Sequence, residues 1–483
     1  MTHSADIDLS HAGRRVVGHG LDAWLAEARE TLKLAGPLVF TQVAQMAIMT
    51  TDIIMLGRVG QTALASSALG ITAFFFCWLI GAGPVAAVAP MIAHILGAHP
   101  HDRANVRVVV RMGLWAVVIV ALPLMGLLAF VKPILIALHQ KPELAAGAGQ
   151  FTAALAIGLP FSLFFQVLRN FTTALDRPRA PLYVMVIGIA FNFIGDYALI
   201  FGHFGMPRLG LVGSAMASAA SYAFQFLALL AIVFATPKLR QFHILRDLLE
   251  ADWEKLEEVF RLGMPIGLTM MFEAMLFNSA TLMMGTFGAA TVAAHQISMN
   301  VPSNTFMVPL GIGMAATIRV GLAAGAGDRE AVRRAGYTAL GLGVAFMTLT
   351  SIVIALFPRE IAHLYFPDGR AHNEEAVALA VTFLRVAAAF QVFDGLQVVA
   401  ALSLRGLKDA SAPMWIAGGS YWLAGFPVCV ALGFGLGMKG LGIWIGLAFA
   451  LLVAASTMCW RFWHLSRDRQ PARLGSLAEG AVE

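Results

Sequence analysis

The sequence contains little charge: only 13% of its 483 residues are Asp, Glu, Lys or Arg, about half the share of an ordinary soluble domain. Hydrophobic residues make up 59% of the chain. Apolar runs of about 20 residues recur from end to end, and each is long enough to cross a bilayer as a helix. The strict alternation of polar and apolar residues that marks membrane β-strands is missing. The composition therefore predicts an all-α integral membrane protein.

The sequence also has few cysteines and no P-loop motif for nucleotide binding. The three cysteines, Cys77, Cys429 and Cys459, lie in apolar runs without CxxC or Cys/His spacing, so neither a disulfide framework nor a zinc site is predicted. The ATP-binding pattern GxxxxGK[ST] is absent. We therefore expect no cofactor.

Twelve transmembrane helices are expected. The polar residues 1–33 contain no apolar core, so a cleavable signal peptide is not predicted. The approximate spans are 34–57, 63–95, 107–131, 149–174, 181–201, 211–234, 259–285, 290–322, 335–357, 375–404, 413–434 and 441–464.

The net charge of +5 could suggest a nucleic-acid partner, but the placement of the basic residues gives a simpler account. With the N-terminus in the cytoplasm, 25 of the 33 Lys and Arg residues fall in cytoplasmic segments. This is the positive-inside distribution of an inner-membrane protein. It predicts that both termini are cytoplasmic, and it leaves no reason to expect nucleic acid as a partner.

An internal repeat divides the chain. At a constant offset of 228 residues (265 minus 37), Pro37 aligns with Pro265 and Gln45 with Glu273. Six spans return the chain to its starting side, so the repeat predicts two parallel, pseudo-symmetric six-helix lobes with a substrate route between them. The predicted parts are an N-terminal cytoplasmic segment with an interfacial helix (1–33), an N-lobe (34–234), a linker with an amphipathic helix (235–258), a C-lobe (259–464) and a polar cytoplasmic tail (465–483).

Three carboxylates, Asp52, Glu273 and Asp394, lie within apolar spans. An unpaired charge there costs several kcal/mol, and such residues usually mark a transport pathway. The repeat does not duplicate them, because Asp52 aligns with Ala280 and Glu273 with Gln45. Two chemically distinct sites are therefore predicted.

The first-lobe site is expected to combine Asp52 with Asn192 and Asp196, which lie one helical turn apart. Asn170 and Ser214 are further candidates. Asp196 lies near the outer end of its span, so a solvated position is the alternative.

The second-lobe site is expected to pair Glu273 with Asp394. His295 fits either a proton carrier or a hydrogen-bonded packing residue, and Arg385 is expected to reach the outer surface rather than the cavity. Further polar residues that could line the cavity are Gln45, Asn278, His295, Gln296, Asn300 and Gln391.

Clustered carboxylates away from water favour the protonated form, so both sites are suited to exchanging protons. Their oxygens are also hard ligands for Na⁺, either at Glu273 and Asp394 or at Asp52 and Asp196. Acids among Met, Phe and Leu side chains favour a lipophilic organic cation as substrate. Pro37, 15 residues before Asp52, is the predicted hinge of the first span.

Three segments carry a resemblance to a known family: MTTDIIMLGRVG, AAHQISMNVPSNTFMVPLGIGMAATIRVG and FDGLQVVAALSLRGLKD. Over residues 30–460 the chain resembles the multidrug and toxic compound extrusion (MATE) family. Glu273 with Asp394 matches its NorM-type branch, and Asp52, Asn192 and Asp196 match the first-lobe site of the DinF-type branch. The NorM-type pattern tends to carry Asn where this chain has Asp196, which leaves the coupling ion open.

The resemblance implies that the two lobes form a V and that the protein is not an enzyme. It implies a bacterial inner-membrane antiporter that exports lipophilic, mostly cationic drugs and dyes in exchange for H⁺ or Na⁺. H⁺ is favoured, because Asp52 and Asp196 are suited to sharing a proton. A two-lobe monomer needs no protein partner. The alternative is a lipid-linked oligosaccharide flippase of the same superfamily, whose anionic substrate calls for basic rather than acidic cavity residues. An ion channel is disfavoured, because no filter-like segment is repeated.

Overall fold

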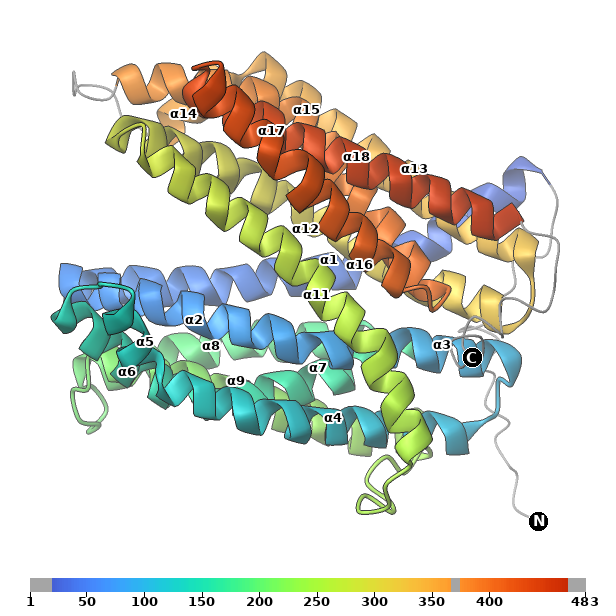
Figure 1. Ribbon diagram of the computed structural model, residues 1–483. Coiled ribbons are helices and arrows are strands. Elements are labelled where there is room, and N and C mark those ends of the chain that lie inside the picture. The colour runs from blue at the N-terminus through green and yellow to red at the C-terminus, as the bar shows by residue number, and fades with distance from the viewer. Residues whose placement is uncertain (1–19, 366–373, 468–483) are drawn as a thin grey trace, which may run out of the picture. The chain divides into compact units, whose positions relative to one another are not determined.

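The computed structural model describes residues 20–365 and 374–467, and within them all regular secondary structure is helical (Figure 1). Eleven helices are long and apolar enough to cross a membrane, and α6 (Pro142–Ala156) with α7 (Gly158–Ala174), bent by 44°, supplies a twelfth. The predicted all-α fold is thereby confirmed, and the 11 or 12 candidate spans of the described residues agree with the twelve expected. The start of the predicted N-terminal segment and most of the predicted tail lie outside the described residues.

The chain forms two compact units, and two long helices contribute to both. Phe40–Gly267 form the first unit, and the described residues up to Val39 and from Leu268 onward form the second. The division falls inside α1 (Leu21–Val59), two residues after Pro37, and inside α11 (Trp253–Gly285), two residues after Pro265. Both helices run through their proline without a break. The two division points are therefore related by the sequence repeat.

In the first unit, α2, α4 and α7 pack against one another, and α9 packs on α7 and α8 (Figure 1). The helices between α1 and α11 are α2 (Gln61–Ala86), α3 (Val88–Ala98), α4 (Arg103–Ala129), α5 (Val131–Ala137), α6, α7, α8 (Arg179–Phe201), α9 (Leu211–Ala235) and α10 (Pro237–Arg240).

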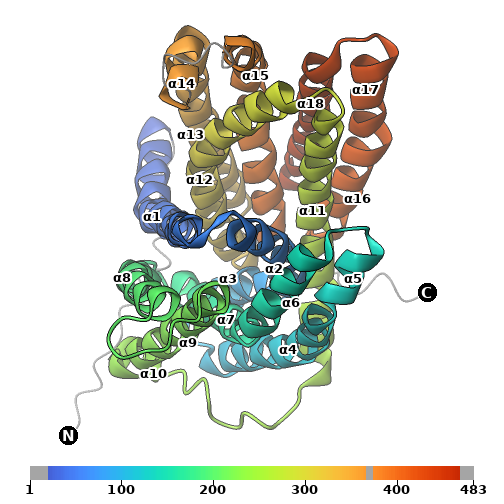
Figure 2. The same cartoon turned by 90° about the vertical axis from the view of Figure 1, so that its left-hand side faces the viewer.

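In the second unit, α15 packs between α12, α13 and α18 (Figure 2). One predicted span, 413–434, alternates α-helix with π-helix. The elements after α11 are α12 (Ala289–Gly325), α13 (Arg329–Leu356), α14 (Pro358–Tyr365), α15 (Glu374–Gly406), α16 (Ser411–Gly418), the π-helix η3 (Gly419–Gly425), α17 (Phe426–Val430), the π-helix η4 (Ala431–Gly435) and α18 (Lys439–Arg467).

The repeat extends to local details. Asp102 caps α4 by accepting a 3.0 Å hydrogen bond from the Asn105 backbone N–H, and Asp328 caps α13 by accepting one of the same length from Ala331. A side-chain oxygen at this position satisfies one of the unpaired N–H groups of a helix start. Corresponding helices in the two units therefore begin by the same means.

Each unit also contains one very close helix crossing. A Cβ added to Gly83 of α2 would lie 2.8 Å from the Cα of Gly267 in α11, and one added to Gly311 of α12 would lie 2.9 Å from the backbone N of Val39 in α1. Glycine permits such backbone approach because it has no side chain. The two crossings are related by the repeat, since 311 − 83 and 267 − 39 both equal 228.

The N-terminal interfacial helix expected from the sequence is not a separate element. Residues 21–33 are the first part of α1, and their face formed by Ala23, Glu27 and Thr31 is buried. Glu27, only 2% exposed, accepts hydrogen bonds from Arg319 Nε at 2.8 Å and Nη2 at 2.7 Å. Ala23, Glu27 and Thr31 lie four residues apart, so they share one side of the helix. This face packs within the second unit.

The amphipathic helix expected in the linker is likewise absent as a separate element. Residues 246–249 form turns. Only the part of the predicted helix from Trp253 onward is helical, and it is the start of α11. Arg111 and Trp115 of α4 donate hydrogen bonds to the carbonyls of Asp247 (2.9 Å) and Leu248 (2.8 Å). These side chains satisfy linker carbonyls that a continuous helix would have used internally.

Candidate functional site

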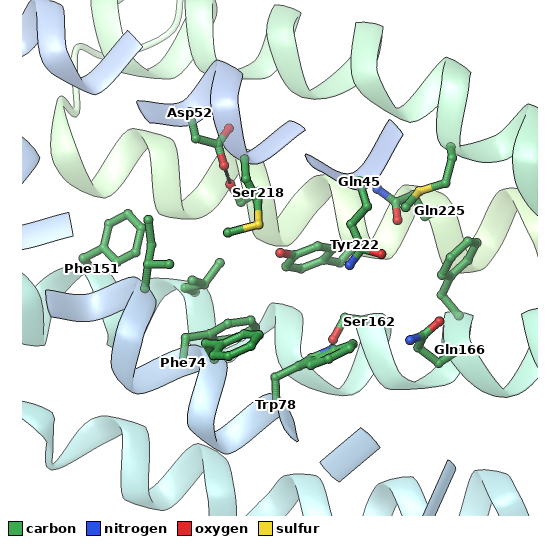
Figure 3. Close-up of a pocket in the computed structure, with 16 residues that line it drawn as sticks. Gln45, Asp52, Phe74, Trp78, Phe151, Ser162, Gln166, Ser218, Tyr222 and Gln225 are labelled. Carbon is green, nitrogen blue, oxygen red and sulfur yellow. Dashed lines mark hydrogen bonds between the residues drawn. The ribbon is translucent and has the colours of Figure 1, made fainter. Parts of the chain in front are cut away.

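A cavity of about 120 Å³ lies within the first unit (Figure 3). Aromatic rings form much of its wall, and the rings of Phe74 and Tyr222 lie parallel with centroids 6.2 Å apart. Asp52 is the charged residue of the lining, which contains no Lys or Arg. The lining residues are Gln45, Met49, Asp52, Ile71, Phe74, Phe75, Trp78, Phe151, Leu155, Ser162, Phe165, Gln166, Met185, Ser218, Tyr222 and Gln225.

Asp52 is held at the cavity by α9. Ser218 Oγ donates a 2.9 Å hydrogen bond to Asp52 Oδ2 (Figure 3). Ser214, Ser218 and Tyr222 follow one another at four-residue intervals, so α9 presents all three on one face. The half-buried carboxylate therefore borders both the cavity and a stripe of hydroxyl groups.

A second, fully buried layer lies next to Asp52. Asn192 and Asp196 of α8 and Ser214 of α9 are each 0% exposed. Asp52 interacts with Asn192 and Asp196, and Asp196 interacts with Ser214. The structure thus brings together the residues that the sequence assigns to the first-lobe site, and the burial of Asp196 excludes the solvated alternative.

The polar atoms of this cluster are poorly satisfied. Asp52 Oδ1, both carboxylate oxygens of Asp196, both amide atoms of Asn192 and Ser214 Oγ are buried without a hydrogen-bond partner among the described residues. Each such atom costs about 1–3 kcal/mol. Carboxylate, amide and hydroxyl oxygens fit a proton or Na⁺, either of which would relieve this cost.

Asn170 has a different position. It lies in α7 and donates a 2.8 Å hydrogen bond from Nδ2 to the carbonyl of Val85, near the end of α2. This bond links α7 to the last turn of α2. Gln45, which the repeat aligns with Glu273, does line the cavity.

The second unit contains the other two acids. Asp394 of α15 is 5% exposed, Glu273 of α11 is half-buried, and the two carboxylates interact electrostatically. Asp394 Oδ1 has no hydrogen-bond partner within the described ranges. Arg405, near the end of α15, interacts with Glu273. Arg385, nine residues before Asp394 in α15, is exposed.

His295 and Gln391 are buried in the second unit. His295 Nε2 lies 3.1 Å from Thr281 Oγ1, and its ring meets Trp444 edge-to-face with centroids 5.6 Å apart. Its Nδ1 has no partner in the described part of the chain. Gln391 accepts a hydrogen bond from Thr305 (3.1 Å) and donates one to Thr350 (2.9 Å), so it joins three helices.

Three predicted cavity residues are exposed: Asn278, Gln296 and Asn300. Asn278 Nδ2 donates to the carbonyl of Ala274 in its own helix (2.8 Å), and Asn300 Oδ1 accepts from the hydroxyl of Tyr365 (2.8 Å). These hydrogen bonds do not connect them to Glu273 or Asp394.

Comparisons with known proteins match both halves of the repeat. The MatE family model matches residues 37–198 and 265–431, more than half of the chain. The chain belongs to the MatE family. A MatE relative from Brucella suis, named probable multidrug resistance protein NorM, is 41% identical over 440 residues, which cover 91% of this chain and 93% of the relative. The multidrug resistance protein NorM of Burkholderia vietnamiensis is 38% identical, with 95% and 98% covered.

Solved MATE structures share the fold of this MatE protein. The Vibrio cholerae MATE transporter VcmN in its bent form superposes with a TM-score of 0.80 at 18% identity, with 92% of this chain and 98% of that chain covered. The eukaryotic MATE transporter AtDTX14 gives 0.81 at 22% identity, with 92% and 99% covered.

Sequence reasoning misses several residues of this MatE protein's acid sites. Ser218 and Tyr222 lie four and eight residues after Ser214, so a helical period through the predicted Ser214 would have found them. Arg405 gives no such signal, because it lies at a predicted span end where a basic residue is ordinary. Tyr421, which interacts electrostatically with Glu273 and Asp394, gives none either, since an aromatic residue in an apolar span usually packs in the core.

Proposed function

We propose that this MatE-family protein exports lipophilic, mostly cationic compounds across the bacterial inner membrane in exchange for H⁺ or Na⁺. Export proceeds by alternating access between the two units, without covalent chemistry. The observation that carries the proposal is the cavity of the first unit, where aromatic and Met side chains surround a single carboxylate, Asp52. Relatives named as multidrug resistance proteins support it. We further propose that the protein acts as a monomer with both termini in the cytoplasm.

The cavity chemistry matches such substrates. Aromatic faces attract organic cations by about 0.5–1 kcal/mol each at exposed sites and by about 2 kcal/mol when water is excluded. Apolar walls bind the lipophilic part of the molecule. Asp52 supplies the opposite charge. A broad set of flat, cationic compounds can satisfy these requirements without specific hydrogen bonds.

Ion coupling follows from the cluster beside the cavity. The interactions of Asp52 and Asp196 in the described part of the chain involve each other and neutral side chains, with no basic group. A proton or Na⁺ that enters the cluster cancels the negative charge that holds the drug, so ion and drug oppose each other in binding. H⁺ is the preferred ion, because two adjacent acids readily share one proton.

A lipid-linked oligosaccharide flippase is the less favoured function. Its anionic pyrophosphate lipid needs basic groups in the binding cavity. The lining of this cavity has an acid and no Lys or Arg.

The test is efflux of ethidium from proteoliposomes, driven by an imposed pH gradient or an imposed Na⁺ gradient, each alone. Asp52→Asn should abolish gradient-driven efflux, because the amide neither binds the cation by charge nor exchanges a proton. Asp328→Asn is the matched control: Asn caps a helix about as well as Asp, so α13 and efflux should be unaffected. Full efflux by Asp52→Asn would refute the proposed coupling. Efflux that is driven by the Na⁺ gradient but not by the pH gradient would refute H⁺ as the coupling ion.

A further inference from the structure

The π-helix η3 begins beside the second acid site. A Cβ added to Gly418, the residue before η3, would lie 3.3 Å from Cε2 of Phe272, which directly precedes Glu273 in α11. π-Helical turns are rare, and they often occur at functional sites because the extra residue per turn redirects side chains. Tyr421, three residues after Gly418, lies within this turn.

Tyr421 has an unusual environment for a tyrosine. It is 0% exposed and among the largest fully buried side chains, yet its hydroxyl has no hydrogen-bond partner among the described residues. A phenylalanine would fill the same space without leaving a polar atom unsatisfied, and Phe383 and Phe390 serve that role elsewhere in the same unit. Packing alone therefore does not account for the hydroxyl.

Tyr421 lies within electrostatic range of two acidic side chains. Its side chain interacts electrostatically with both Glu273 and Asp394. Asp394 Oδ1 is also buried without a partner in the described part of the chain. Two buried oxygens without partners among the described residues, one from η3 and one from α15, thus belong to side chains that interact electrostatically with each other and with the Glu273 carboxylate of α11.

We propose that the Tyr421 hydroxyl completes a site for one positive charge, a proton or Na⁺, together with the carboxylates of Glu273 and Asp394. Arg405 sets the charge of the site: two carboxylates and one guanidinium leave a net charge of −1, which a single H⁺ or Na⁺ neutralises. The hydroxyl oxygen is a ligand for Na⁺, or it accepts the hydrogen bond of a protonated carboxyl. This inference rests on the ion-coupled export proposed above.

The test uses Tyr421→Phe, which removes only the hydroxyl, with Tyr337→Phe as control because Tyr337 packs edge-to-face on Phe462 in the same unit. Ethidium efflux from proteoliposomes is measured against H⁺ concentration under a pH gradient, and against Na⁺ concentration under a Na⁺ gradient. For the ion that drives efflux, Tyr421→Phe should raise the half-maximal concentration about tenfold, as expected for loss of one contact to a charged group. The maximal rate should stay unchanged, and thermal unfolding should occur at the same or a higher temperature.

Two results would overturn the inference while leaving the proposed function intact. One is an unchanged half-maximal concentration in Tyr421→Phe. The other is a lower maximal rate at an unchanged half-maximal concentration, which marks a purely structural role. If neither gradient drives ethidium efflux by the unmodified protein, the proposed function and this site are both overturned.

Discussion

At the scale of single residues, the two acid sites differ in how their charge is balanced. Asp52 and Asp196 interact with hydroxyl and amide groups, whereas Glu273 has Arg405 as a basic neighbour. A carboxylate without a basic partner in a dry environment is the more easily neutralised by an arriving cation. The first-unit site is therefore the better candidate for direct competition between ion and drug.

Ser218→Ala tests how Asp52 is held. Loss of the 2.9 Å hydrogen bond leaves the ionised carboxylate less stable, so cationic dye should bind about tenfold more weakly. Ser221→Ala is the control, because Ser221 is equally buried in α9 but donates to the carbonyl of Ala217 in its own helix. Fluorescence titration of each purified variant measures its affinity for the dye. Equal affinities for the two variants would show that Ser218 does not support Asp52.

The candidate sites are only partly predictable from the sequence. Acids in apolar spans are recognisable because they are costly there, and the repeat correctly separates Asp52 from Glu273 into two halves. Hydroxyl groups such as those of Ser218 and Tyr421 carry no comparable cost in a sequence, since most of them bond to their own helix or to water. Their roles depend on which helices pack together.

At the scale of elements, the close crossings of α2 with α11 and of α1 with α12 mark where backbones touch. Both lie within two residues of the points at which α1 and α11 divide between the units. Helix existence and number are well predicted, because hydrophobic length alone determines them. The π-helices and the bend between α6 and α7 are not, since no single residue type specifies either.

Gly83→Ala probes the first crossing. The added methyl group would meet backbone atoms of Gly263 and Gly267, which cannot rotate away, so overpacking should cost about 1–3 kcal/mol and lower the unfolding temperature. Gly126→Ala, in α4 with nothing within 4 Å of the new methyl, should be neutral or slightly stabilising. Thermal unfolding in detergent compares them. An unfolding temperature as high for Gly83→Ala as for Gly126→Ala would contradict the tight crossing.

At the scale of the whole molecule, the compact units do not coincide with the two halves of the chain. The first unit includes the start of α11, and the second includes the first part of α1. The sequence predicts lobes that end at the linker, because hydropathy and repeats locate spans but not the partners against which each span packs.

A chain cut between residues 246 and 247 should therefore give two fragments that each lack part of a unit. Co-expressed fragments should restore ethidium efflux, whereas either fragment alone should be degraded or aggregate, because a buried helix face would be left uncovered. Immunoblots of membranes and efflux assays on cells report the two outcomes. Stable accumulation of the second fragment alone would show that residues up to Val39 are dispensable for its unit.

The pairing of Glu27 with Arg319 has a consequence for synthesis. The two residues are 292 positions apart, so at about 5–20 residues per second the ribosome needs about 15–60 s to deliver the arginine after the glutamate. During that interval the start of α1 must keep its acid in water or on the insertion machinery. The first helix to enter the membrane is thus among the last to be fully packed.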